Sequence, residues 1–351
     1  MQADYLVIGQ GISGTFLSWE LQQANQTFIV IDESNPHTAS KVAAGVINPV
    51  TGRRIVKTWM IDELMPFAWQ AYQSIGEALH INCITEKDII DCFPTPQMRL
   101  AFIERYEKDQ QFLALPTNPN DWLERIQYDF GYGIIHPCYL IDLQLLLINY
   151  RKKLLQNNQL LEERFEGGQL IIKDDSIQYK DIHARKIIFC DGIAGFDNPY
   201  FKNLPYGPNK GEVILVEIPG LPATHIIKRG YSLIPWTENI FWLGSTYLWE
   251  FEDTNPTKGF YQFAENWLKQ TVKMPFKIID HMAAVRPATL ERRPFVGLHP
   301  VHPSIGILNG MGTKGCSLVP WFARQLVNHL VNGTAINADA DVQRFKRVLS
   351  R

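Results

Sequence analysis

The feature that most constrains the fold of this chain is a glycine-rich loop, GQGISG, at residues 9–14. It follows a continuous apolar run, YLVI, at residues 5–8, and residues 13–24 then have the pattern of a helix. A second apolar run, FIVI, occupies residues 28–31. Uninterrupted apolar runs of this length are typical of parallel strands that are covered on both faces. The sequence therefore predicts a β-α-β unit at the N-terminus.

The loop matches the pattern G-x-G-x-x-G, which is typical of dinucleotide-binding turns. We expect Gly9 to allow the tight turn after the strand, Gly11 to let a pyrophosphate approach the backbone, and Gly14 to let the helix pack closely on the sheet. Ile12 and Ser13 lie at the start of the helix, where free N–H groups and the positive end of the helix dipole attract phosphates. These residues are the first candidates for cofactor binding.

Asp32 ends the second strand, 18 residues after Gly14. A carboxylate at this place can accept hydrogen bonds from a ribose 2′-hydroxyl, and it disfavours the 2′-phosphate of NADP. Glu33 is the alternative for the same role. The motif predicts an adenine dinucleotide but does not distinguish FAD from NAD.

Composition narrows the class of protein. Hydrophobic residues make up 46% of the 351 residues, charged residues 20%, and the formal net charge is -2. These values are ordinary for a globular enzyme, and the charge argues against nucleic acid as a partner. We find no apolar run long enough to span a membrane and no signal peptide, so we expect a cytoplasmic protein. The five scattered cysteines predict neither a metal site nor disulfides.

The middle of the chain has a different pattern from its ends. Short apolar runs separated by polar turns predict strands, and longer periodic segments predict helices. The predicted strands include residues 170–172, 187–189, 213–216, 226–227, 231–234 and 240–243, and the predicted helices include residues 66–79, 141–155 and 318–331. A strand at 305–308 and another glycine-rich loop return the chain to an α/β pattern. We expect a Rossmann-like domain interrupted by an antiparallel sheet.

One segment after Asp32 carries a resemblance to a known family. The residues ASKVAAG at 39–45, followed by VINP at 46–49, resemble the second signature block of the D-amino-acid oxidase/glycine oxidase superfamily of FAD enzymes. In that family this loop runs beside the flavin ring. Small side chains there would let a flat ring pack against the backbone. The resemblance implies contacts to FAD from Ser40, Ala43, Ala44 and Gly45.

Further blocks resemble the same family, in the family's order. They are GYGIIHPCYLID (131–142), IIFCDG (187–192), PNKGE (208–212), AVRP (284–287) with RPFVG (293–297), and GMGTKG (310–315). The resemblance implies that Gly192 lies in a turn near the adenine. It also implies an FAD-binding domain of the glutathione-reductase type. We assign residues 1–58, 141–205 and 284–351 to this domain, and residues 59–140 and 206–283 to an inserted substrate domain.

The last of these blocks would serve the flavin itself. In the resembling family a C-terminal glycine-rich turn directs N–H groups and a helix dipole at the N1/C2 edge of the flavin, where reduction adds negative charge. The matching residues are Gly312, Thr313, Lys314 and Gly315.

The resemblance also implies an activity, the oxidation of a C–N bond in a small amine or amino acid by hydride transfer to flavin N5. Arg286 is the residue that it would place on the substrate carboxylate, which a planar guanidinium fits well. The alternative role for Arg286 is a structural ion pair. Two departures from the family stand out: Thr313 occupies the place of a second arginine, and no cysteine lies between Arg286 and Cys316, which implies non-covalent FAD.

Other features leave alternatives open. Arg53, Arg54 and Lys57 could bind a larger anionic substrate, although a solvated helix start is the preferred explanation. The aromatic residues of the predicted second sheet are mostly expected in the core, with one or two lining the pocket. They are Tyr231, Trp236, Trp242, Tyr247 and Trp249.

Two alternative functions also remain. The strings RPAT (286–289) and GMGTKGCSLVP (310–320) resemble the FAD domain of the bifunctional tRNA wobble-uridine modification enzyme, which oxidises a secondary amine on RNA. An NAD-dependent dehydrogenase is the second alternative. The oligomeric state is not predicted.

Overall fold

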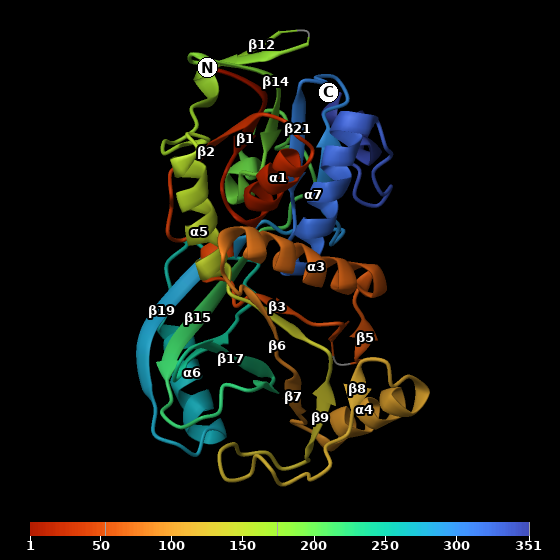
Figure 1. The fold of residues 1–351 in the computed structure, drawn as a ribbon. Helices are drawn as coiled ribbons and strands as arrows, with labels where there is room; N and C mark the ends of the chain where they lie inside the picture. Colours follow the sequence, from red (N-terminus) through yellow and green to blue (C-terminus); the bar gives the residue numbers. More distant parts are fainter. Residues whose placement is uncertain (53, 174, 351) are drawn as a thin grey trace.

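The computed structural model describes residues 1–52, 54–173 and 175–350. Within them, two eight-stranded sheets dominate the fold, and we call them sheet 1 and sheet 2. Figure 1 shows sheet 1 in the upper half of the molecule with both chain termini, and sheet 2 in the lower half. The helix α3 (Ile61–Leu79) crosses between the two halves.

Sheet 1 has the order β11-β2-β1-β14-β13-β12, and β21 pairs with β14 and with β20. The strands β11, β2, β1, β14 and β21 run parallel, whereas β12, β13 and β20 pair antiparallel with their neighbours. Their bounds are β1 (Gln2–Ile8), β2 (Phe28–Ile31), β11 (Leu160–Leu161), β12 (Leu170–Ile172), β13 (Ile177–Tyr179), β14 (Ile182–Phe189), β20 (Phe295–Leu298) and β21 (Ile305–Asn309). The predicted parallel unit is therefore present.

The first strand and helix form as the sequence predicts. Tyr5 and Val7 pack into the core on one face of sheet 1, and Leu6 and Ile8 pack into the core on the other face, because side chains alternate along a strand. Helix α1 (Ile12–Gln23) follows the glycine loop and is buried along most of its length. It ends before Asn25, which adopts the left-handed conformation that commonly terminates helices.

Sheet 2 has the order β19-β15-β18-β17-β16-β7-β9-β8 and is antiparallel except for the β16–β7 pair. Its strands are β7 (Ile89–Cys92), β8 (Leu113–Ala114), β9 (Tyr132–Ile135), β15 (Asn209–Glu217), β16 (Ile226–Arg229), β17 (Tyr231–Thr237), β18 (Ile240–Gly244) and β19 (Lys277–Arg286). One face packs on helix α6 (Lys258–Thr271), where Ile214 and Leu268 share a core. The other face turns toward sheet 1.

The remaining elements connect and cover the two sheets. Two small sheets contain β3 (Val46–Ile47), β6 (Ile84–Glu86) and β10 (Tyr139–Ile141), and β4 (Val50–Thr51) with β5 (Val56–Lys57). The other helices are α2 (Ala39–Val42), α4 (Pro96–Lys108), α5 (Leu143–Gln156), α7 (Gly315–Asn332) and α8 (Lys346–Leu349), with 3-10 turns at Gly167–Gln169, Gly192–Phe196 and Val342–Phe345. Among the described residues, no helix combines the length and apolar composition needed to cross a bilayer.

The predicted start of the second long helix is wrong. Helix α3 begins at Ile61 rather than at residue 66, so Pro66 lies inside the helix. Asp62 and Glu63 occupy its first turn, where negative charge stabilises the positive end of the helix dipole.

Candidate functional site

A cavity of about 1360 Å³ lies between the carboxyl ends of the parallel strands and the facing side of sheet 2. It exceeds the range of about 300–1,000 Å³ that is usual for a single small-ligand pocket. Most of the residues predicted from the sequence line it: Gly9, Gly11, Ile12, Ser13, Asp32, Glu33, Ser40, Ala43, Ala44, Gly45, Gly192, Gly312, Thr313, Gly315 and Arg286. Gly14 lies beneath the loop, and the Lys314 side chain points elsewhere.

The glycine loop needs glycine for reasons of space. Gly9 has φ +97, and a Cβ there would lie 2.6 Å from the carbonyl oxygen of Cys190. A Cβ on Gly14 would overlap the carbonyl oxygen of Gly9 itself. The loop, the segment after β14 and the start of α1 are therefore in direct backbone contact.

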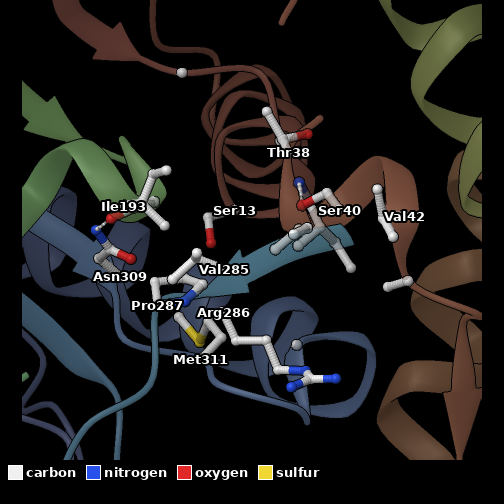
Figure 2. A pocket seen from close by; sticks show the side chains of 18 of the residues that line it. Ser13, Thr38, Ser40, Val42, Ile193, Val285, Arg286, Pro287, Asn309 and Met311 are labelled. Carbon is white, nitrogen blue, oxygen red and sulfur yellow. Dashed lines mark hydrogen bonds between the residues drawn. The ribbon is translucent and has the colours of Figure 1, made fainter. Parts of the chain in front are cut away.

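The start of α1 presents donors to the cavity. Its N-cap, Gly11, provides no side-chain cap, and the Ile12 N–H donates to Ser40 Oγ at 3.1 Å. The N–H groups of Ser13 and Gly14 have no acceptor within the helix, because the first turn of a helix lacks preceding carbonyls. Figure 2 shows Ser13 and Ser40 close to each other at the pocket wall. Such a turn can bind the phosphates of a dinucleotide.

Asp32 lies at the end of β2 and accepts three hydrogen bonds. The donors are the N–H of Gln10 at 2.8 Å, the N–H of Ser34 at 2.8 Å and Nη1 of Arg151 at 2.7 Å. Arg151, on α5, also pairs with Glu162 at 2.9 Å. These contacts fix the carboxylate beside the cavity, where it can still accept from a sugar hydroxyl. Sequence reasoning missed Arg151, because no local signal links α5 to the end of β2.

Two loops of small residues face each other farther along the cavity. Gly45 has φ +83, and a Cβ there would overlap the carbonyl oxygen of Ile141. Opposite it, Gly312 has φ +56 and donates its N–H to Pro287 O at 3.1 Å. Helix α7 begins at Gly315 without a side-chain cap, so the N–H groups of Gly315 and Cys316 have no acceptor within the helix. A flat ring system fits between such walls.

Lys314 does not contribute its side chain to this cavity. Its ammonium donates to Thr58 Oγ1 at 2.8 Å, behind the loop. Burial and the neighbouring Arg292 lower the pKa of Lys314 to about 8. Only the main chain of Lys314 remains near the position that the sequence suggested.

A partly buried polar group that the sequence did not reveal lies just after β14. Asp191 accepts from Nδ2 of Asn309 at 2.9 Å and from Nδ2 of Asn198 at 3.1 Å. Burial raises the pKa of Asp191 to about 6. Figure 2 shows Asn309 beside the segment of Ile193, where its amide also donates to Gly192 O at 2.8 Å.

Arg286 ends β19 and faces the cavity from sheet 2. Nη1 donates to Asn209 Oδ1 at 2.6 Å and to Thr246 O at 3.2 Å, and Nη2 donates to Ser245 Oγ at 2.6 Å. The Tyr247 ring lies 4.8 Å from the guanidinium carbon. All of these partners are neutral, so the described residues do not give Arg286 a structural carboxylate. Burial lowers the pKa of Arg286, but a guanidinium stays charged at neutral pH.

The remaining predicted residues divide between cavity, core and surface. Tyr231, Trp242 and Tyr247 line the cavity, whereas Trp236 packs against the core and Trp249 is exposed. In the cation cluster, Arg54 is exposed and Lys57 pairs with Asp62 at 3.1 Å. Neither of these two lines the cavity, and Arg53 lies outside the described residues. The described part of the chain also holds no group of side chains arranged to bind a metal ion.

Comparisons with known proteins agree with this geometry. Residues 4–329 match the model of the family described as FAD dependent oxidoreductase (DAO). Solved structures with the same fold include glycine oxidase from Geobacillus kaustophilus (18% identity, 98% of this chain and 99% of that chain, TM-score 0.75). They also include L-proline dehydrogenase from P. horikoshii (14% identity, 99% and 98%, TM-score 0.77).

A curated relative is larger than this chain. It is the tRNA 5-methylaminomethyl-2-thiouridine biosynthesis bifunctional protein MnmC of Acinetobacter baylyi, which is 24% identical over 94% of this chain. The match spans 53% of the relative, so this chain corresponds to about half of that protein. The family match covers most of the chain, from β1 into α7. The chain therefore belongs to the DAO family of FAD-dependent oxidoreductases.

Proposed function

We propose that this protein oxidises the C–N bond of a small amino acid or amine whose carboxylate binds Arg286. The observation that carries the proposal is the guanidinium itself, a half-buried cation on the cavity wall held by neutral partners. Such a cation favours an anionic ligand, because a carboxylate can make charge-assisted hydrogen bonds to its free N–H groups. The glycine oxidase and the L-proline dehydrogenase of the same fold are named for amino-acid substrates.

The same cavity also provides the proposed binding site for FAD. We propose that the first turn of α1 holds the FAD phosphates, that Asp32 holds the adenosine ribose, and that the loops at 43–45 and 312–315 hold the flavin ring. FAD, when bound, supplies the acceptor for the two electrons of the C–N bond. Burial raises the pKa of Cys316 to about 12, so this cavity-lining thiol is a poor nucleophile, which supports non-covalent binding. The family assignment displaces NAD as the cofactor.

The chain's own residues would bind and orient the substrate. Arg286 fixes the carboxylate, and Ser245 with Asn209 fixes the guanidinium. Tyr247 and Trp242 line the pocket and reduce access of water to the reacting carbon. The substrate loses a hydride and a proton and becomes an imine.

We also retain the proposed domain division. The strands of sheet 1 fall within the residues assigned to the FAD-binding domain. Those of sheet 2 fall within the residues assigned to the substrate domain, apart from the end of β19 that carries Arg286.

The variant Arg286→Leu tests the proposal. We expect its FAD content to be unchanged and its affinity for carboxylate ligands to fall at least 100-fold, about 2.7 kcal/mol. Ligand binding is measured by the change in the absorption spectrum of bound flavin, with a panel of amino acids, N-methyl amino acids and matching amines without the carboxylate. Lys277→Met removes a cation from the exposed start of the same strand and serves as the control. Unchanged affinity in Arg286→Leu would remove this residue from the substrate site.

A second candidate function is amine oxidation on tRNA. It is favoured by the similarity to the tRNA-modifying protein of Acinetobacter baylyi, of which this chain matches about half. The net charge of -2 gives it no general support, because RNA binding usually needs a basic face. Binding of bulk tRNA to the purified protein at several salt concentrations tests it. Micromolar binding that weakens steeply with salt would support it, and no binding at low salt would exclude it.

A further inference from the structure

We propose that the substrate is much longer than glycine. Its carboxylate binds Arg286, and a neutral oxygen acceptor at its other end binds Lys228. This inference rests on the proposed function, because it takes Arg286 as the carboxylate site. It gives Lys228 a role in substrate specificity, at a position away from the bond that is oxidised. The supporting observations are the position of Lys228 on sheet 2, its pairing with Asp91, and the extent of the cavity.

Lys228 faces the same cavity as Arg286. It lies on β16 and lines the cavity together with Ser232 of β17. The register of the sheet places Lys228 opposite Ser232, and Ser232 opposite Gly244 of β18. Because side chains alternate along strands, these positions share the face of sheet 2 that turns toward the cofactor cavity. Gly244 has no side chain, so nothing projects from β18 into the cavity between β17 and β15 at this position.

The distance between the two cations means that a substrate contacting both must be longer than glycine. From β16 to β19 there are four steps between neighbouring strands, and Arg286 lies four residues beyond Met282, which is in line with Lys228. At about 4.8 Å per step and about 3.3 Å per residue, the two Cα atoms are roughly 23 Å apart. Even with both side chains extended toward each other, a gap on the order of 10 Å remains. Glycine spans only a few ångströms, since its bonds are each about 1.5 Å long.

The partner of Lys228 indicates which chemical group it takes. Its ammonium donates to Asp91 Oδ2 at 2.8 Å; the Asp91 side chain is 3% exposed and that of Lys228 is 24% exposed. Asp91 therefore lies behind Lys228 and neutralises it, and two N–H groups of the ammonium remain. A carboxylate would compete with Asp91 for the same charge. An amide carbonyl or a hydroxyl matches the pair without that conflict.

Two N-substituted glycines of equal length test the inference. One carries a five-atom arm that ends in a primary amide, and the other an arm that ends in a methyl group. Binding is followed by the spectral change of bound flavin in the FAD-loaded protein, so no turnover is needed. We expect the amide-terminated compound to bind at least 10-fold more tightly, and Ser232→Ala to reduce this preference about twofold.

The decisive variant removes the pair as a unit. Lys228→Met alone leaves Asp91 buried without a partner and can impair folding. The double variant Lys228→Met/Asp91→Leu leaves no unpaired charge, and we expect its preference for the amide to fall below twofold while the methyl-terminated compound binds as before. Lys269→Met, on the α6 side of sheet 2, is the control.

The outcomes separate the two proposals. Equal binding of both compounds to the native protein, or a preference that survives in the double variant, would overturn the role of Lys228. If that binding still disappears in Arg286→Leu, the proposed function stands without this inference. If neither compound binds, or if binding does not depend on Arg286, both proposals fail.

Discussion

On the β1 side of the cavity the polar groups come mainly from the main chain, whereas on the sheet 2 side they come from side chains. The first wall is built from glycine turns and from the first turns of α1 and α7, which have no side-chain caps. The second wall presents Arg286, Lys228 and Ser232 from three different strands. A backbone site requires close contact between turns, and a side-chain site requires only that strands lie in register. We therefore expect the two walls to respond differently to small substitutions.

The largest expected effect is that of Gly14→Ala. The conformation of Gly14 is allowed for alanine, but the added Cβ overlaps the backbone oxygen of Gly9, which has no freedom to move. We expect FAD affinity to fall more than 1000-fold, or the protein to lose about 4 kcal/mol of stability. Flavin content after gel filtration and thermal unfolding by circular dichroism measure the two results.

A second glycine provides the control for this substitution. Gly259 lies in the first turn of α6, and a Cβ there meets nothing within 4 Å. Gly259→Ala should leave FAD content unchanged and raise stability by up to about 1 kcal/mol. If Gly14→Ala behaved like Gly259→Ala, the close contact between the loop and α1 would not be needed for FAD binding.

The next effect concerns Asp191, a carboxyl group on the backbone-built wall whose pKa is shifted. Burial raises the pKa of Asp191 to about 6, above its usual value of 3.8. The folded protein therefore binds more protons than the unfolded chain between about pH 4 and pH 6, and its stability falls as pH rises through that interval. Above pH 6 the ionised Asp191 side chain lowers the free energy of unfolding by its full amount. We expect about 2 kcal/mol, because water in the cavity weakens the effect of burial. Cys190 and Tyr206 are the titratable neighbours, and both are neutral in this range.

Asp191→Asn removes this dependence. Urea unfolding at pH 4.5, 5.5 and 7 should show that the variant gains stability relative to the native protein as pH rises. Asp197→Asn, in the exposed part of the same turn, should follow the native profile. A constant difference between Asp191→Asn and the native protein at all three pH values would contradict the shifted pKa.

The contrast between the walls also explains what could be predicted from the sequence. Gly9, Gly11 and Gly14 form a local pattern whose geometry is fixed by neighbouring residues, so the β-α-β unit was predictable. The place of Arg286 beside the cavity was predictable only because a proline follows it in a segment that resembles a known family. The contacts between Arg151 and Asp32, between Asn309 and Asp191, and between Lys228 and Asp91 join residues 119, 118 and 137 positions apart. No sequence pattern contains such pairs, because folding alone brings them together.

The smallest effect should appear at Gly211, on the side-chain-built wall. A Cβ on Gly211 overlaps the Arg286 guanidinium, which is the end of a flexible side chain rather than fixed backbone. We expect Gly211→Ala to keep its FAD and to weaken carboxylate binding 10- to 30-fold, about 1.4 to 2 kcal/mol, as the guanidinium shifts away from Asn209 and Ser245. Titration of the flavin spectrum with a carboxylate ligand measures it. In an Arg286→Leu background the same substitution should have little further effect, because the group that it displaces is gone. Loss of FAD from Gly211→Ala with unchanged carboxylate affinity would reverse the roles assigned to the two walls.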